Sequence, residues 1–507
     1  MTHLKLYDEK RFDVYPELFG SFLEHMGTVI YTGVYEPGHP TATKEGFRGD
    51  VLELVKALGV KTLRYPGGNY TSSYHWEDTV GPKPDRPRCM NIAWQSIETN
   101  QFGLHEFFQW AKEAGVTNPI LTVNLGTRGI DDALHELEYV NGRYDTKWAN
   151  LRRRNGRDTP FEVKYWCLGN ELDGPWQVAR KTPEEYGRLA NETSKAMKML
   201  DPSIQTILVG SSTPNIATYP SWDFKVLMEA YDNVDFIAMH NYIDREQSQN
   251  LDKQITRASD ELPTYLARSR EFDKQIEEIE AIADAVKALK HSDKTMNISF
   301  DEWNVHHFSG KEPRPWEEHN PVDWCYFDLA DTLLFGSMAL AILRHGDRVH
   351  LSCQALLVNT IPLILTDEDG AAWANPTYYV LQSLLHNITD TTEVVESVLP
   401  DGDVYNTNLY ADVPIIDQVT IDTGSAYVVY AVNRGLATQN LEVEFPVKVI
   451  GGKQETITGN IDDMNTREHP KTLTLHKVDD FSVNVGEMKQ AAILPGYSWN
   501  VLTFSYE

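Results

Sequence analysis

The feature that most constrains the fold of this chain is a regular alternation of short β-type runs with longer helical patterns. Eight apolar runs rich in β-branched and aromatic residues can be counted, at residues 18–26, 60–66, 119–125, 163–169, 205–210, 234–239, 297–301 and 349–358. Segments with the apolar spacing of amphipathic helices lie between them, among them 50–58, 104–114, 183–200, 272–289 and 324–343. Eight strand–helix units in succession predict an α/β fold, a (β/α)8 barrel over residues 15–370.

Beyond about residue 366 the pattern becomes all-β. Runs of strand type at 427–433, 441–445, 472–477 and 499–506 are separated by Gly, Asn and Asp turns, and no long helical pattern follows Leu385. We therefore predict a β-sandwich accessory domain of jelly-roll type over residues 371–507. We expect the N-terminal segment 1–14 to add a strand to this domain, because a barrel needs none before its first strand.

Composition narrows the classes of partner. The formal net charge of −28 argues against nucleic acid and anionic membrane surfaces as partners, and suits a neutral substrate. No uninterrupted apolar stretch reaches the ~18 residues of a membrane span, and the first residues lack the pattern of a signal peptide, so we expect a cytoplasmic protein. Four widely spaced cysteines show no disulfide or metal-ligand spacing. The basic run Arg152–Arg154 is interpreted as a solvated or subunit-contact surface.

Polar or ionisable residues stand at the ends of all eight predicted strands. They are Glu24 and His25, Arg64 and Asn69, Asn124, Asn170 and Glu171, Ser211, His240 to Tyr242, Glu302, and Asn359. Because the carboxyl ends of barrel strands surround one mouth, we predict that these residues ring a pocket. Two long loops, 70–95 and 131–159, follow the second and third runs and are expected to shape access to it.

Two of these residues form the pair on which the chemistry depends. Glu171 follows the fourth strand and Glu302 the seventh, so their side chains can converge over the mouth. Hydrolysis of a glycosidic bond needs one carboxyl group to protonate the leaving oxygen and another to meet the oxocarbenium-like carbon. Neither glutamate is informative alone, but the pair at matching strand ends, with Asn170 directly before Glu171, predicts a glycosidase.

Two histidines and an aspartate near these glutamates have simpler interpretations than a catalytic or metal-binding role. His306 and His307 suggest metal ligands, but adjacent strand residues face opposite ways and no Asp/Cys/His cluster accompanies them, so we interpret both as structural or solvent-facing and expect no metal. Strand alternation also predicts that Asp301 points away from Glu302. His240 and Tyr242 are expected to line the pocket.

The segments around these residues show a family resemblance. Asn170-Glu171 and Glu302 resemble the signature of the clan of retaining (β/α)8 glycosidases, and the chain resembles more narrowly the family 51 α-L-arabinofuranosidases. The matching segments are G-S-F-L-E-H-M-G (20–27), L-R-Y-P-G-G-N-Y (63–70), W-E-D-T-V-G-P (76–82), A-W-Q-S-I-E-T-N-Q-F-G (93–103), N-L-G-T-R-G (124–129), W-C-L-G-N-E-L-D-G-P-W-Q (166–177), H-N-Y (240–242) and D-E-W-N-V (301–305). They span nearly the whole predicted barrel in the expected order.

The resemblance implies roles for individual residues. Glu171 matches the general acid/base and Glu302 the nucleophile. Arg64 matches a cation beside the nucleophile that helps to keep it ionised, and Trp94 an aromatic residue bordering the leaving-group side. Four positions match residues that hydrogen-bond the arabinofuranose or orient the catalytic pair: Glu24, Asn69, Asn170 and Tyr242. The family also implies a barrel plus β-sandwich, and commonly a homo-hexamer.

One position departs from the family pattern. Leu356 stands in C-Q-A-L-L-V-N where the family often has a glutamine, and Gln354 lies two residues earlier. Because an extended strand repeats every two residues, Gln354 faces the same side, and whether it replaces the family glutamine is open at this point.

The implied activity is an exo-acting retaining α-L-arabinofuranosidase. Terminal L-arabinofuranose would be released from arabino- or arabinoxylo-oligosaccharides by double displacement, without a cofactor. A β-xylosidase or endoglucanase on the same scaffold is the first alternative, because a fold does not determine the substrate. A carbohydrate-binding protein that has lost catalysis is the second, and the presence of both glutamates argues against it.

Overall fold

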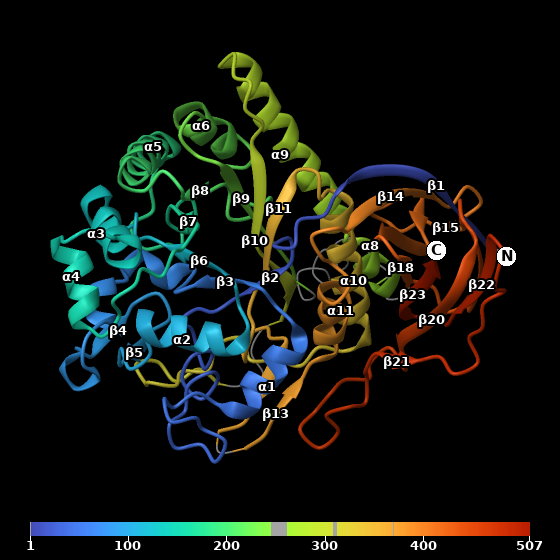
Figure 1. Cartoon of the computed structure of the whole chain (residues 1–507), viewed down its shortest axis with the longest axis horizontal. Helices are drawn as coiled ribbons and strands as arrows, with labels where there is room; N and C mark the ends of the chain where they lie inside the picture. The colour runs from blue at the N-terminus through green and yellow to red at the C-terminus, as the bar shows by residue number, and fades with distance from the viewer. Residues whose placement is uncertain (1, 245–260, 308–311, 369) are drawn as a thin grey trace.

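The fold was obtained as a computed structural model, which describes residues 2–244, 261–307, 312–368 and 370–507. Within these ranges eight parallel strands close into a barrel, in the order β10-β11-β2-β3-β6-β7-β8-β9. The strands are β2 (Gly20–Phe22), β3 (Thr62–Tyr65), β6 (Asn118–Thr122), β7 (Tyr165–Cys167), β8 (Gln205–Leu208), β9 (Phe236–Asp244), β10 (Asn297–His306) and β11 (Val349–Gln354). Each overlaps one predicted run, so the predicted barrel is confirmed (Figure 1).

Helices surround the barrel. They are α1 (Gly49–Leu58), α2 (Leu104–Ala114), α3 (Ile130–Asn141), α4 (Lys147–Arg154), α5 (Pro183–Leu200), α6 (Ser221–Ala230), α8 (Glu261–Ala267), α9 (Arg270–Leu289), α10 (Leu329–Arg344) and α11 (Pro376–Leu385). Their sequences explain where they begin. In α5, for example, Thr182 and Glu185 form a reciprocal capping box and Pro183 occupies the first turn, where its missing N–H costs nothing.

Helix α10 is apolar on every side. All its residues from Leu329 to Leu343 are buried, because the helix packs against barrel strands β10 and β11 on one side and against the C-terminal sheet on the other. Gly336 allows the close approach: a Cβ there would lie 2.7 Å from the Trp499 ring. Although α10 is this apolar, the described helices include none that is long and apolar enough to cross a membrane.

The C-terminal part is rich in β-structure, as predicted. In the described chain its strands form a nine-stranded sheet in the order β21-β20-β23-β18-β17-β14-β1-β19-β22. The strands are β1 (Thr2–Asp13), β14 (Glu393–Val398), β17 (Ile416–Asp422), β18 (Ala426–Asn433), β19 (Gln439–Glu444), β20 (Val449–Thr458), β21 (His476–Lys477), β22 (Lys489–Leu494) and β23 (Ser498–Tyr506). The run predicted at 472–477 is a strand only at its last two residues.

The N-terminal strand β1 explains why this sheet is continuous. It pairs antiparallel with β14 and parallel with β19, and so joins two layers that a sandwich would keep apart. Residues from strands on both sides of β1 in the order, such as Leu494 of β22 and Phe504 of β23, share one apolar cluster with Leu4 and Leu6. The sheet therefore curls around a core of its own, and Figure 1 shows the blue β1 crossing from the barrel into the red strands.

Helix α11 contacts both parts of the molecule. It packs against α1 and α10, and the side chains of Tyr378 and Gln382 donate to backbone carbonyls of α1, those of Leu54 and Ala57. The predicted division at residue 370 would assign α11 to the β-rich domain. Ser383 of the same helix accepts hydrogen bonds from Tyr430 and Trp499 of the C-terminal sheet, so the predicted division stays a prediction.

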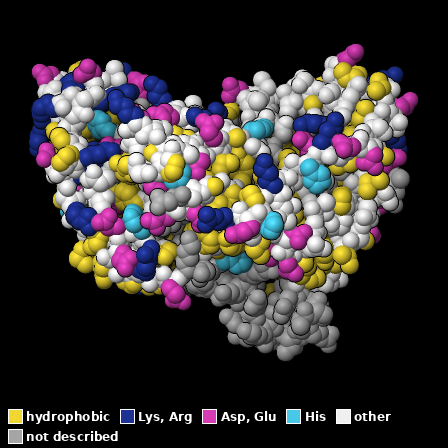
Figure 2. All heavy atoms as spheres, turned by 90° about the horizontal axis from the view of Figure 1, so that it is seen from below, with side chains coloured by type: hydrophobic (Ala, Val, Ile, Leu, Met, Phe, Trp, Pro, Cys, Tyr) yellow, Lys and Arg dark blue, Asp and Glu magenta, His cyan; other side chains and the backbone are white. Residues whose placement is uncertain are grey.

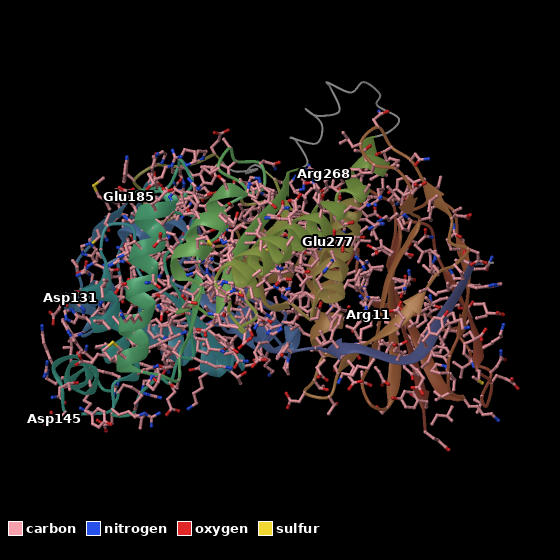
Figure 3. All side chains as sticks on the ribbon, turned by 90° about the horizontal axis from the view of Figure 1, so that it is seen from above. Arg11, Asp131, Asp145, Glu185, Arg268 and Glu277 are labelled. Atoms are coloured by element: carbon pink, nitrogen blue, oxygen red, sulfur yellow. The ribbon has the colours of Figure 1, made fainter. Side chains whose placement is uncertain are left out.

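The interpretation of Arg152–Arg154 as a solvated surface is wrong for Arg152. Its side chain is buried inside the loop that α4 closes, where it donates to the backbone carbonyls of Tyr139 and Gly142. Arg154 is exposed. Lys and Arg side chains gather at the left end of the face shown in Figure 2, the end at which Figure 1 draws α4. Figure 3 places Asp131 and Asp145 at this same end, opposite the β-rich domain.

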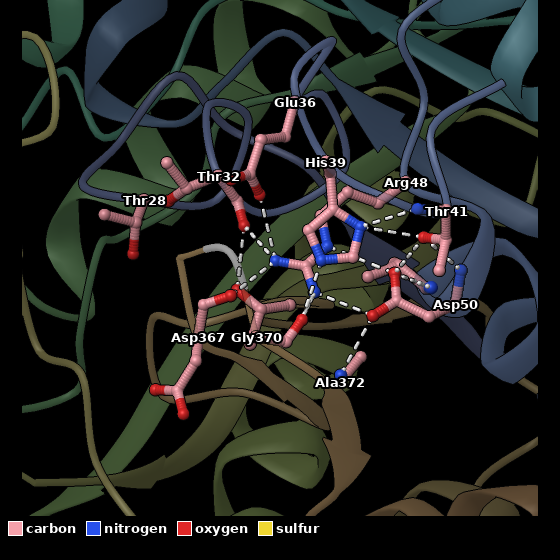
Figure 4. A network of polar contacts seen from close by, with 12 residues as sticks. Thr28, Thr32, Glu36, His39, Thr41, Arg48, Asp50, Asp367, Gly370 and Ala372 are labelled. Carbon is pink, nitrogen blue, oxygen red and sulfur yellow. Dashed lines mark hydrogen bonds and ion pairs between the residues drawn. The ribbon is translucent and has the colours of Figure 1, made fainter.

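A buried arginine joins the loops on one side of the barrel mouth. Arg48 donates to the backbone carbonyls of Thr32, Asp367 and Gly370 and to the carboxylate of Asp50 (Figure 4). The contacts connect the loop after β2 to the loop between β12 (Ile364–Thr366) and β13 (Ala372–Ala374). Because both loops are continuous with segments that line the pocket described next, Arg48 holds their relative position.

Candidate active site

A pocket of about 590 Å³ opens at the carboxyl ends of the barrel strands. The polar lining residues are Glu24, Asn69, Glu171, Tyr242, Glu302, His306 and Asp323, and the two tryptophans are Trp94 and Trp176. An apolar wall is formed by Phe22, Met26, Leu356 and Ile361. The remaining lining residues are Gly68, Ala93, Gln177 and Val178. Glu171 and Glu302 therefore share one pocket. A volume of this size fits a small organic ligand.

Glu302 lies within β10 rather than at its end, because the strand continues to His306. Its Oε1 accepts a hydrogen bond of 2.6 Å from the Arg64 guanidinium, and its Oε2 one of 2.7 Å from the Tyr242 hydroxyl. A cation and a hydroxyl donor on opposite oxygens stabilise the charged form of a carboxylate. Burial and the charge of Glu302 in turn raise the pKa of Tyr242 well above its usual value, so the phenol remains a donor.

The prediction that Asp301 points away from Glu302 is wrong. Asp301 Oδ2 lies 3.7 Å from the Nε of Arg64, the same guanidinium that binds Glu302. The physical reason is an irregularity in β10: its register with β9 shifts between Ser299 and Glu302, which breaks the strict alternation of side chains. Asp301 does not line the pocket, and the charges of Arg64 and His240 lower its pKa although burial opposes this.

Glu171 stands four residues after β7, in a sharp turn. Gly169 has a φ of 95°, which favours glycine, and Glu171 itself has a φ of 45°, a strained conformation for a residue with a side chain. Its Oε2 accepts a hydrogen bond of 2.7 Å from the indole N–H of Trp176, and its Oε1 lies 2.9 Å from Nδ1 of His240. Burial and the nearby Glu302 raise the pKa of Glu171, whereas the two donors oppose the rise.

His240 connects the two carboxyl groups to the barrel interior. Its Nδ1 meets Glu171 and its Nε2 lies 3.0 Å from Oδ1 of Asp301, and surrounding carboxylates raise its pKa well above the usual value. A protonated imidazole donates from both nitrogens, which fits these two acceptors. One oxygen each of Glu171 and Glu302 and a nitrogen of His240 lie within 4.8 Å of one another. Three such groups can hold a metal ion. A doubly protonated His240 that donates to Glu171 and to Asp301 explains the same contacts without one.

Arg64 and two asparagines connect Glu302 to the segment that carries Glu171. Arg64 donates through Nη2 to Asn170 Oδ1 at 2.7 Å, and Asn170 donates to Asn69 Oδ1 at 3.0 Å. The guanidinium lies over the Phe22 ring, 4.6 Å from its centroid. One arginine thus orients Glu302 directly and the segment that carries Glu171 through Asn170.

Glu24 is the third acid of the pocket. Its Oε1 accepts hydrogen bonds of 2.8 Å from the Tyr70 backbone N–H and from the Trp94 indole N–H. Burial and the charge of Glu302 raise its pKa to about 8. A Cβ on Gly68 would lie 2.4 Å from Glu24 Oε2, so only glycine allows the loop after β3 to pass this close.

The loop that carries Trp94 is fastened by a second buried histidine. It contains the hairpin of β4 (Cys89–Asn91) and β5 (Ser96–Glu98). Glu98 Oε2 lies 2.7 Å from Nδ1 of His25, whose Nε2 meets the Tyr65 hydroxyl at 2.9 Å, and Glu98 Oε1 accepts from Tyr31. This cluster ties the hairpin to the end of β2, next to Glu24.

The structure brings all eight predicted site residues together, but not every polar strand end faces the pocket. Asn124 and Asn359 bind backbone of neighbouring loops, and Ser211 binds Asp223. Gln354 is fully buried between Ser21 and the carbonyl of Leu356, so it does not line the pocket and Leu356 does. These groups hold neighbouring segments of the chain and do not line the pocket.

Three residues that line the pocket were not among the predicted site residues: Trp176, His306 and Asp323. Trp176 follows Glu171 by five residues, and its place inside the matching segment 166–177 was the available indication. His306, interpreted as structural, lines the pocket and pairs with Asp323, whereas His307 pairs with Asp331 and does not line it. Nothing in the local sequence of Asp323 marked it, because its loop approaches the pocket only in three dimensions.

Comparison with known proteins agrees with this geometry. Residues 54–261 match the family described as α-L-arabinofuranosidase 1 domain, and residues 301–498 match the α-L-arabinofuranosidase C-terminal domain. The intracellular exo-α-(1→5)-L-arabinofuranosidase 1 of Bacillus subtilis is 39% identical over 499 residues, 97% of this chain and 96% of that protein. A family 51 α-L-arabinofuranosidase from Bifidobacterium longum superposes with a TM-score of 0.92 at 36% identity, covering 99% of both chains.

A second solved structure is more distant in sequence. The α-L-arabinofuranosidase of Thermotoga maritima in its arabinose complex has a TM-score of 0.87 at 29% identity, with both chains covered in full. Two matching family domains, full-length relatives and the same barrel with a separate sheet-rich domain lead to one assignment: the chain belongs to the family 51 α-L-arabinofuranosidases.

Proposed function

We propose that this protein is an exo-acting, retaining α-L-arabinofuranosidase that releases terminal L-arabinofuranose from arabino- or arabinoxylo-oligosaccharides. The observation that carries the proposal is the placement of Glu171 and Glu302 in one pocket, with carboxylate oxygens within 4.8 Å of each other. Carboxyl groups of retaining glycosidases stand ~5 Å apart, whereas inverting enzymes keep ~6.5–9.5 Å to admit a water molecule. Oxygens this close leave little room for a water molecule between the two groups, which favours double displacement over inversion.

The surroundings of the two glutamates support different roles. Arg64 and Tyr242 stabilise Glu302 as a carboxylate, which suits a nucleophile. Burial and the charge of Glu302 raise the pKa of Glu171, which suits an acid that must hold a proton. Because protonated His240 donates to Oε1 of Glu171, the transferable proton belongs on Oε2, the oxygen that Trp176 contacts.

The proposed reaction has two steps. Glu302 forms a bond to the anomeric carbon while the bond from that carbon to the glycosidic oxygen breaks, and the proton of Glu171 passes to the departing oxygen. Water then attacks the anomeric carbon and gives a proton to Glu171, and the bond to Glu302 breaks. Both residues return to their initial state, and arabinose leaves with retained configuration.

The relatives support the choice of sugar and setting. Several are named exo-α-(1→5)-L-arabinofuranosidases, one from Bifidobacterium longum is named for the 1→6 linkage, and some of these names include the word intracellular. We propose the same terminal sugar and a cytoplasmic location. The homo-hexamer implied by the family resemblance stays a prediction, which light scattering of the purified protein tests.

The first experiment follows nitrophenol release from 4-nitrophenyl α-L-arabinofuranoside and from the β-D-xylopyranoside. We expect strong activity of the wild type on the arabinofuranoside and loss of it in Glu302→Ala. Glu487→Ala, an exposed position of the β-rich domain, is the matched control. Activity mainly on the xyloside would identify the enzyme as a xylosidase. If the folded protein hydrolysed neither substrate, the proposed exo-arabinofuranosidase activity would be refuted. Proton NMR of the first product anomer tests retention directly.

A further inference from the structure

Two polar side chains at the pocket entrance take no part in the proposed chemistry. His306 and Asp323 both line the pocket, and Nε2 of His306 lies 3.2 Å from Oδ2 of Asp323. Each side chain is about one-fifth exposed, at 22% and 23%. Neither contacts Glu171 or Glu302 among the described residues, so the pair needs an explanation of its own.

The position of His306 places the pair on the outer side of the nucleophile. Pairing of β10 with β9 is regular from Glu302 to His306, and four residues of extended strand span about 13 Å. His306 and Glu302 also share one face of the strand, because side chains repeat every two residues. A terminal sugar bound at Glu302 lies deeper in the pocket than His306, so a leaving group that is protonated by Glu171 and continues toward the pocket mouth can reach His306.

Asp323 is held rigidly at this entrance. Its backbone carbonyl accepts from the N–H of Ile361 at 2.9 Å, and the adjacent Val322 carbonyl accepts from the Thr360 hydroxyl. Both Asp323 and Ile361 have positive φ angles, 45° and 36°, although Ile361 is β-branched. Backbone strain of this kind persists where the surrounding structure enforces it. These contacts tie the backbone that carries the Asp323 carboxylate to the segment of Thr360 and Ile361.

The carboxylate of Asp323 keeps an acceptor available. His306 contacts Oδ2, and among the described residues no hydrogen bond reaches Oδ1. The wall beside the pair is apolar, formed by Ile361, Leu356 and Met26. A polar pair next to an apolar wall binds a ligand that has hydroxyl groups on one edge and carbon on its face, which describes a sugar ring.

We propose that His306 and Asp323 bind hydroxyl groups of a sugar leaving group and so make the enzyme selective for oligosaccharides over aryl glycosides. The inference rests on the proposed function and adds the recognition of the second sugar unit. One hydroxyl donates to Oδ1 of Asp323, and the imidazole of His306 contacts the same ring. A site built to hydrogen-bond a hydroxyl discriminates against a ligand that lacks it.

The test compares two substrates that share the arabinofuranosyl group, α-1,5-L-arabinobiose and 4-nitrophenyl α-L-arabinofuranoside. The measured quantity is the ratio of kcat/KM for the disaccharide to kcat/KM for the aryl substrate. Any change that acts on the shared sugar or on Glu302 cancels in this ratio. We expect Asp323→Asn and His306→Gln each to lower the ratio about tenfold, the scale of one lost hydrogen bond to a charged group.

The variants are chosen to fold. Asparagine is among the residues that best tolerate a positive φ, so Asp323→Asn preserves the turn. Asp480→Asn and His476→Gln, both exposed in the β-rich domain, are matched controls and should leave the ratio as in the wild type. The double variant should lower the ratio by less than the product of the single effects, because the two residues contact each other.

Equal losses on both substrates would overturn the inference, because they would show an effect on the shared sugar or on Glu302. An unchanged ratio would overturn it too. Failure of the proposed function is a separate result, since it appears as a wild type that hydrolyses neither substrate.

Discussion

Two buried clusters lie under the barrel mouth, and each contains a glutamate paired with a histidine, but the two glutamates differ in their pKa. The pocket cluster consists of Glu171, His240 and Asp301, and the loop cluster of Glu98, His25, Tyr31 and Tyr65. Both place a histidine against a buried glutamate. Yet the pKa of Glu171 is raised, whereas that of Glu98 is lowered although burial opposes this.

The neighbours of each glutamate explain the difference. Glu98 accepts from His25, from Tyr31 and from the backbone N–H of Asn100, and all of these donors favour its charge. Glu171 has His240 and Trp176 as donors but faces a second carboxylate, Glu302, which disfavours its charge. A glutamate–histidine pair therefore marks a proton-carrying acid only where another carboxylate and a pocket adjoin it.

The largest expected effect separates the two histidines by activity. We expect His240→Ala to lower kcat/KM roughly 10²–10³-fold, because Glu171 loses its orienting donor and Asp301 loses a partner. The basic limb of the pH profile should move to higher pH, since His240 holds down the pKa of Glu171. Steady-state rates from pH 4 to 10 measure both. A loss of activity that only follows a loss of folded protein would assign His240 a merely structural role.

The next effect appears in stability and belongs to the loop cluster. His25→Ala leaves the Glu98 carboxylate buried without its histidine partner, and we expect the free energy of unfolding to fall by about 3 kcal/mol. Urea denaturation measures it, with His386→Ala as a control on an exposed contact. Activity should fall less than in His240→Ala. Equal activity losses in the two histidine variants would abolish the distinction drawn between the clusters.

A smaller change sharpens the role of the second donor to Glu171. Trp176→Phe keeps an aromatic ring at a side chain that is 52% exposed and removes only the N–H that contacts Oε2. The pKa of Glu171 should rise, so kcat/KM should persist to higher pH, with a loss of about threefold to tenfold at neutral pH. Trp316→Phe, at another partly exposed tryptophan, is the control. A basic limb that stays in place would show that the N–H does not act on Glu171.

The smallest expected effect is on the pH dependence of stability and concerns Glu136, a buried acid that has no histidine partner among the described residues. Glu136 in α3 is buried, its Oε1 has no hydrogen-bond partner among the described residues, and burial raises its pKa well above the usual value. A raised folded-state pKa gives stability that is present at low pH and lost as pH rises through that pKa. Glu136→Gln should therefore lose less stability between pH 5 and 9, by about 1 kcal/mol. Asp131→Asn, exposed on the same helix, should follow the wild type.

The sequence predicted those parts of the molecule that depend on local patterns. Each barrel strand is a short apolar run, and Glu171 stands two residues after the end of its run, so both could be recognised without a structure. The β-type runs after residue 426 and the strand expected at 1–14 were recognisable for the same reason. That β1 would pair with both β14 and β19, and so join the layers into one sheet, was not.

The wrong predictions concern side chains whose positions depend on contacts between separate segments of the chain. Asp301 was misplaced because a register shift in β10 breaks the alternation on which the prediction relied. Arg152 was misplaced because the carbonyls that bury it come from the preceding helix and loop. His240 was expected to line the pocket, but it is buried behind the lining. It lies on β9 between Asp301 of β10 and Glu171 in the loop after β7, and only the closed barrel brings these segments together.

The pairing of β1 has a consequence for the order in which the protein is made. A ribosome synthesises β1 before the barrel, but its partners β14 and β19 emerge only about 380 to 430 residues later. At 5–20 residues per second the strand waits roughly 20–80 s without a partner. Lys5, Lys10 and Arg11 lie along it, and charged side chains of this kind discourage an unpaired strand from joining another chain. The second domain is thus begun first and completed last, when β23 leaves the ribosome.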